Sequence, residues 1–138
     1  MDKTDLLRQI NARCQNTLME TLDIEFTAVG EDFVEARMPV TPKVHQPDGV
    51  LHGGASVALA ETVGSVASLI FSKHKNKVVR GIEISANHLK SITSGFITAR
   101  AEILHNGRTT QLWDIKIRNE NQELISVVKL TTLTLVKA

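Results

Sequence analysis

The sequence has almost no cysteine, no excess of charge of either sign and no secretion signal at its start. The only cysteine, Cys14, cannot form an intrachain disulfide, which fits a reducing compartment. With 16 Lys and Arg against 15 Asp and Glu, and no block of like charge, the chain lacks the electrostatic footprint of a nucleic-acid binder. Its first residues have neither a basic start nor an apolar block. We therefore expect a cytoplasmic protein with no nucleic-acid or membrane partner.

Motifs for several kinds of chemistry are also missing. No His-Glu-x-x-His, Cys-x-x-Cys or Asp-rich loop occurs, so we expect no metal. Gly54-Ala55-Ser56 lacks the second glycine of a Gly-x-Ser-x-Gly nucleophile motif, which argues against a serine hydrolase. No repeat, low-complexity segment or linker is visible, and 138 residues are enough to bury one core. We predict a single domain over residues 1–138.

A long apolar stretch, HQPDGVLHGGASVALAETVGSVASLIF (45–71), dominates the chain. Its apolar side chains point in almost every direction around a helix, which is typical of a buried helix. Glu61, Ser65 and Ser68 follow an i, i+4, i+7 spacing and therefore share one face, a polar seam. A membrane span is the alternative, but a central glutamate, several glycines and hydroxyls make insertion costly. We predict a core helix that ends at the polar residues 72–77.

The N-terminal segment predicts an amphipathic surface helix followed by a hairpin. Thr4 is a suitable N-cap, and apolar residues recur every three or four positions up to Leu22. The single cysteine lies on this helix and is interpreted as a packing residue. From residue 24 the apolar period changes to two, and residues 24–40 predict two strands joined by a turn at 30–32.

Four further strands are predicted after the long helix, with turns at 93–95, 105–107 and 119–122. The last strand, 124–136, is uncharged over its second half, so it is either central in its sheet or covered by a partner. One helix cannot be buried by a flat sheet. The predicted fold is therefore α+β, with an antiparallel sheet curled around the helix and a second subunit covering the helix's far side.

Glu61 is the strongest candidate for chemistry, because burying a carboxylate is costly unless it is paired or used. A structural glutamate bonded to backbone or to an arginine is the simpler interpretation. The start of the helix, HGGA (52–55), presents backbone N–H groups at the positive helix end, where an oxyanion would bind. Gly53 is about 12 Å from Glu61 along the helix axis, so both could border one pocket without touching the same atom.

The run HQPDGVLHGGASVALAETVGS, with its core H-G-G-x-x-x-x-L-A-E, resembles the signature of the hotdog-fold acyl-CoA thioesterases. The similarity covers about residues 18–135 and is to the bacterial branch acting on phenylacetyl-CoA, 4-hydroxybenzoyl-CoA and menaquinone-pathway or proofreading aroyl-CoA substrates. It implies about six strands wrapped around one long helix, with a short N-terminal helix. It also implies a homodimer or homotetramer with active sites at the subunit interface, an acyl-CoA substrate and no cofactor.

The resemblance also implies roles for individual residues. Glu61 would act as nucleophile or general base, and the Gly53 N–H would polarise the thioester carbonyl. Gln46 and His52 would orient the thioester and the water, and Ser65 would line the site.

Weaker matches concern the rest of the substrate. His88 and Lys90 resemble positions near the bound CoA or acyl group, and Arg108 resembles a CoA-phosphate contact. The acyl pocket is expected to be shaped by further residues, namely Asp48, Val66, Val79 and Gly81. Asp48 departs from the bulkier or apolar residue of many aromatic-preferring relatives, so the sequence leaves an aromatic and a medium-chain acyl group both open.

The sequence is also compatible with two other functions. Hotdog relatives include hydratases and dehydratases that pair a histidine with a carboxylate, which Glu61 and His52 could supply. A non-catalytic acyl-CoA-binding module is the other alternative.

Overall fold

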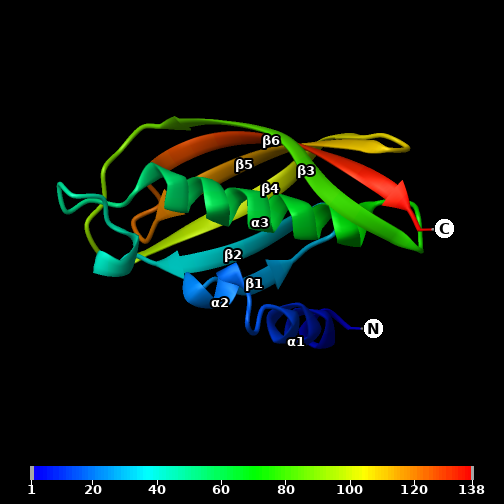
Figure 1. Ribbon diagram of the computed structural model, residues 1–138, viewed down its shortest axis with the longest axis horizontal. Helices are drawn as coiled ribbons and strands as arrows, with labels where there is room; N and C mark the ends of the chain where they lie inside the picture. Colours follow the sequence, from blue (N-terminus) through cyan, green and yellow to red (C-terminus); the bar gives the residue numbers. More distant parts are fainter. Residues whose placement is uncertain (1, 138) are drawn as a thin grey trace.

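The computed structural model describes residues 2–137 and shows a six-stranded antiparallel sheet curled around one long helix (Figure 1). The strand order is β1-β2-β4-β5-β6-β3. The elements in chain order are α1 (Lys3–Arg13), α2 (Leu18–Thr21), β1 (Glu25–Val29), β2 (Phe33–Pro39), the 3-10 helix η1 (Pro42–Val44), α3 (Gly53–Phe71), β3 (Lys77–His88), β4 (Phe96–Asn106), β5 (Thr110–Asn119) and β6 (Leu124–Val136). The α+β architecture predicted from the sequence is confirmed.

The core lies between α3 and the concave face of the sheet. On β5, Trp113, Ile115 and Ile117 are fully buried, as their alternation with charged residues predicts. Gly64 brings the α3 backbone close to the sheet, because a Cβ at this position would collide with the Leu130 side chain of β6. The helix is therefore seated at backbone level on the middle of the sheet.

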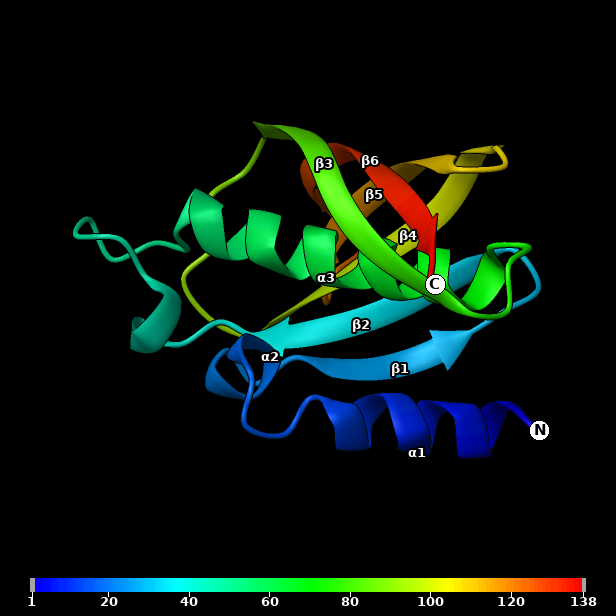
Figure 2. The ribbon, with the colours of Figure 1, turned by 45° about the vertical axis from the view of Figure 1, so that its right-hand side comes forward.

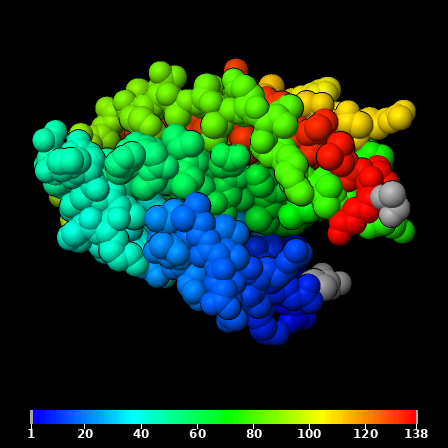
Figure 3. Space-filling view, viewed as in Figure 1, coloured from blue at the N-terminus to red at the C-terminus, as the bar shows by residue number. Residues whose placement is uncertain are grey.

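The other side of α3 is only partly covered by the chain itself. The buried residues of the helix lie along one side: Ser56, Leu59, Ala60, Val63, Gly64, Ala67 and Ser68. Leu69 is 38% exposed, and the space-filling view shows α3 atoms in a band between β3 and the N-terminal helices (Figure 3). The helix is long and apolar enough to cross a membrane by composition alone. Here it is the central helix of the fold.

The N-terminal helix is shorter than predicted. A single helix over residues 4–22 is wrong, because the chain breaks after Arg13 and resumes in the short α2. Asn16 adopts a left-handed φ of 61°, and the Thr17 hydroxyl donates to the Cys14 carbonyl. Such a local bond from a threonine side chain competes with helical ones. The N-cap is also Asp2, whose carboxylate accepts from the Asp5 N–H, and not Thr4.

The two edges of the sheet differ in their cover. At the β1 edge, the Asn11 side chain of α1 bonds to both the N–H and the carbonyl of Phe26, and α1 runs beside this strand (Figure 2). The β3 edge carries no such cover among residues 2–137, and its Ile82 is 56% exposed at a bulge between Gly81 and Glu83. Strand β6 lies between β5 and β3, so the central position predicted as one alternative for the last strand is confirmed.

Candidate active site

A pocket of about 270 Å³ opens at the N-terminal end of α3. The loop before the helix, the first turn of α3, the end of β3 and the start of β6 form its walls. A backbone bond from the Gln46 N–H to the Val50 carbonyl and a positive φ of 79° at Gly49 shape the loop. The residues facing the pocket include Gln46, Gly53, Ser56, His88, Lys90 and Ser126.

The first N–H groups of α3 are satisfied unequally. The Gly54 N–H donates to His52 Nδ1 at 2.7 Å, and the Ala55 N–H donates to the His52 carbonyl at 3.0 Å. The Gly53 N–H finds no acceptor within residues 2–137. This group therefore lies free at the positive end of a 19-residue helix, beside the pocket. It is well placed to donate to an anion or to a polarised carbonyl oxygen.

The ring of His88 lies directly against Gly53. Its Nε2 atom is 2.7 Å from the position that a Cβ on Gly53 would occupy, so only glycine fits here without displacing the ring. On its other side, His88 Nδ1 lies 2.8 Å from the hydroxyl of Ser126. The pocket thus brings together the predicted Gly53 and His88 and adds a serine that the sequence did not single out.

His52 and Gln46 have different places. The His52 side chain caps α3 and borders a second hollow, with Leu22 and Ala58, on another side of the helix. Its predicted contact with the thioester and the water stays a prediction. Gln46 faces the pocket, and its Oε1 accepts from the Asp48 N–H, so its amide N–H groups remain available.

Glu61 is half-buried in the middle of α3 and lies against Gly81 of β3, where any Cβ would collide with its carboxylate. No hydrogen bond or ion pair joins this carboxylate to another residue in the described part of the chain. The structural glutamate paired with backbone or arginine is therefore not found within the protomer. Glu61 does not line the Gly53 pocket, and about 12 Å of helix separates the two residues.

The polar seam on α3 divides into two parts. Ser65 is half-buried one turn beyond Glu61, and its predicted place in the lining of the site stays a prediction. Ser68 is fully buried, accepts a bond from Trp113 Nε1 at 2.7 Å and contacts the Thr132 hydroxyl at 2.6 Å. The polar seam predicted from the sequence therefore does not extend to Ser68 as an accessible group, because its hydroxyl is used in the core.

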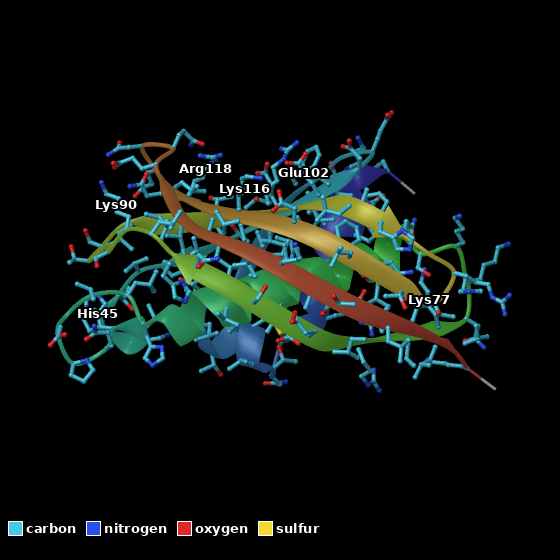
Figure 4. All side chains as sticks on the ribbon, turned by 90° about the horizontal axis from the view of Figure 1, so that it is seen from above. His45, Lys77, Lys90, Glu102, Lys116 and Arg118 are labelled. Atoms are coloured by element: carbon cyan, nitrogen blue, oxygen red, sulfur yellow. The ribbon has the colours of Figure 1, made fainter. Side chains whose placement is uncertain are left out.

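The residues predicted to contact CoA do not gather in one place. Lys90 borders the pocket and pairs with Glu123 at 2.5 Å, and this hydrogen bond, followed by one from Asn119, lowers the pKa of Glu123. Arg108 lies in the β4–β5 turn, where its carbonyl accepts from His74 beyond the end of α3. Figure 4 shows Lys90 at one end of the sheet and Lys77, the start of β3, at the other.

Val79 and Gly81 lie on β3 on the side of Glu61 and do not line the Gly53 pocket. No group of three His, Cys, Asp or Glu residues suited to a metal ion occurs within residues 2–137. Two pocket-lining serines, Ser56 and Ser126, were not among the candidate residues predicted from the sequence. Nothing local marks Ser126, since its partner is 38 residues away and only the β3–β6 pairing joins them.

The chain is similar in sequence and in fold to several known proteins. The sequence model of the thioesterase superfamily matches residues 48–126. A 1,4-dihydroxy-2-naphthoyl-CoA hydrolase of Escherichia coli is 43% identical over 129 residues, which cover 94% of each chain. The proofreading thioesterase EntH of Cronobacter turicensis is 44% identical over 126 residues, 91% of each chain. A thioesterase crystal structure from Haemophilus influenzae superposes with a TM-score of 0.91 at 46% identity, covering 94% of this chain and 90% of the other.

Proposed function

This chain belongs to the thioesterase superfamily, and we propose that it hydrolyses acyl-CoA thioesters with an aromatic or medium-chain acyl group. In this reaction water cleaves the acyl C–S bond, giving the free acid and the thiol of CoA, and no cofactor is needed. The names of the naphthoyl-CoA hydrolase and the proofreading thioesterase support the choice of substrate. The observation that carries the proposal is the free Gly53 N–H beside a pocket, on the same helix as an unpaired carboxylate.

Each residue would act on a defined part of the substrate. The Gly53 N–H would donate to the thioester carbonyl oxygen and stabilise the negative charge that develops there. Gln46 would hold the thioester in place through its free amide. Glu61 would either attack the carbonyl carbon, forming an anhydride that water then opens, or remove a proton from the attacking water. In both routes the C–S bond breaks as the tetrahedral intermediate collapses, and the thiolate leaves and takes up a proton.

We propose that a second copy of the chain completes each site. One protomer separates Gly53 from Glu61 by about 12 Å along α3, too far for both to act on one carbonyl. The β3 edge and one side of α3 also lack a cover from the described residues, and exposed sheet edges favour pairing with another strand. In a two-fold dimer, Glu61 of one protomer would meet the Gly53 pocket of its partner. The cytoplasm remains the proposed location.

A substrate panel tests the function directly. Purified protein is mixed with aromatic and aliphatic acyl-CoAs, and a thiol reagent follows the release of CoA. We expect release with at least one aromatic or medium-chain thioester, and its loss in Glu61→Gln. A change in enoyl absorbance without thiol would indicate a hydratase. Stoichiometric acyl-CoA binding without turnover would indicate a binding module, and either result would contradict the proposal.

A further inference from the structure

His88 and Ser126 are direct cross-strand partners at the end of β3 and near the start of β6. Cross-strand partners place their side chains on the same face of the sheet, and here His88 Nδ1 and Ser126 Oγ are 2.8 Å apart. Ser126 is fully buried, and the opposite edge of the His88 ring lies against Gly53. The serine thus contacts one edge of the ring, the opposite edge lies against Gly53, and both side chains border the pocket.

The burial of Ser126 favours one direction for this hydrogen bond. A hydroxyl has one hydrogen to donate, and a buried donor without an acceptor costs about 1–3 kcal/mol. Within residues 2–137, His88 Nδ1 is the only atom that forms a hydrogen bond with Ser126 Oγ. This cost favours the arrangement in which the hydroxyl donates to Nδ1 and Nδ1 carries no hydrogen. A neutral imidazole in this state carries its hydrogen on Nε2.

We propose that Ser126 holds neutral His88 in the form with its hydrogen on Nε2, so that this N–H and the Gly53 N–H bind the same thioester carbonyl oxygen. Nε2 is the ring atom nearest to Gly53, at 2.7 Å from a Cβ placed there, and both residues line the pocket. Two fixed donors stabilise a developing oxyanion without reorganisation. His88 is then a catalytic donor and Ser126 a positioning residue. This inference rests on the proposed thioester hydrolysis.

The position of the hydrogen is measurable without any substrate. Long-range ¹H–¹⁵N spectra of the imidazoles at alkaline pH distinguish a nitrogen that carries hydrogen from one that does not, and the His88 signals are identified by their absence in His88→Gln. We expect the Nε2–H form in the wild type and a mixture of both forms in Ser126→Ala. Thr134→Val removes a buried hydroxyl that bonds Gln111 instead, and it should leave His88 unchanged. An Nδ1–H form in the wild type would overturn the proposal.

Kinetics test the role of the donor. With an acyl-CoA that the wild type hydrolyses, His88→Asn should lower kcat by about 10²-fold at nearly unchanged KM, the mark of an interaction made in the transition state. His88→Gln should recover part of this loss, because its amide N–H can reach the place of Nε2. Ser126→Ala should lower kcat about 10-fold and Thr134→Val should not. Equal kcat values for wild type, His88→Asn and Ser126→Ala would overturn the proposal. A wild type without thioester hydrolysis would instead contradict the proposed function, and the spectra would still decide the position of the hydrogen.

Discussion

The start and the middle of α3 carry the two halves of the candidate site, and a single chain satisfies their polar groups very differently. At the start, His52 binds the neighbouring N–H groups, leaving the Gly53 N–H free, and His88 lies against Gly53 with Ser126 behind it. In the middle, the Glu61 carboxylate lies against Gly81 with no hydrogen-bond partner in the described chain. The donor half is therefore completed within one chain, whereas the carboxylate half depends on what else approaches α3.

Among the variants that separate the two halves of the site, Glu61→Gln should lower kcat the most. The amide keeps the size of the side chain but can neither attack the thioester nor accept a proton, so we expect kcat to fall about 10²–10⁴-fold. Steady-state kinetics measure the loss, and an unchanged thermal unfolding midpoint is the control. Single-turnover hydrolysis in ¹⁸O-labelled water separates the two roles, since water that opens the anhydride at the Glu61 carboxyl carbon leaves an unlabelled Glu61 oxygen in the first product and the label in Glu61. Activity close to wild type would refute the assignment.

Gly53→Ala tests the donor half and its relation to the carboxylate half. The new Cβ would meet His88 Nε2, so we expect kcat to fall about 10²–10³-fold through the displaced donor. Heterodimers of Gly53→Ala and Glu61→Gln subunits, purified by two different tags, should recover about half of the wild-type activity if each site takes its halves from two subunits. Heterodimers as inactive as either parent would show that one subunit supplies both halves.

Gly81→Ala should disturb only the carboxylate half. A Cβ at this position would displace the Glu61 carboxylate, and a misplaced catalytic group lowers the rate by about 10- to 100-fold. The double variant Gly81→Ala/Glu61→Gln is the sharper measurement. If the alanine acts through Glu61, the double variant should be no slower than Glu61→Gln alone. A further additive loss would mean that Gly81 acts on the substrate or on the fold.

The smallest expected effect concerns the pair of Glu123 with Lys90, which borders the Gly53 pocket, and it is measured as a change of stability with pH. Pairing with Lys90 lowers the pKa of Glu123 in the folded state, so this pair adds stability above the ordinary glutamate pKa and loses it as the pH falls through the lowered value. In Glu123→Gln, the fall in unfolding midpoint between neutral and acid pH should be slightly smaller than in the wild type. Identical pH profiles would show that the exposed pair contributes nothing.

Much of the fold was predictable because its signals are local. The boundaries of α3 follow from a continuous apolar run between glycines and a polar segment, and the strands follow from alternation such as that around Trp113. The position of the free N–H at Gly53 also follows, since every helix start leaves backbone donors unsatisfied. The break of the N-terminal helix after Arg13 was not predicted, because the apolar periodicity continues through Cys14, Asn16 and Thr17.

The sequence by itself determined the helix, the strands and the identity of the groups that could do chemistry, because spacing of three, four or two residues is a property of the chain. Only the tertiary structure decided which of these groups meet. It turned Ser68 into a core residue bonded to Trp113, placed Gly81 against Glu61 and set Ser126 behind His88. Each of these contacts joins residues 20 to 45 positions apart along the chain. Such contacts depend on the register of β3 on β6 and on the depth at which Gly64 seats the helix, and periodicity carries no information about either.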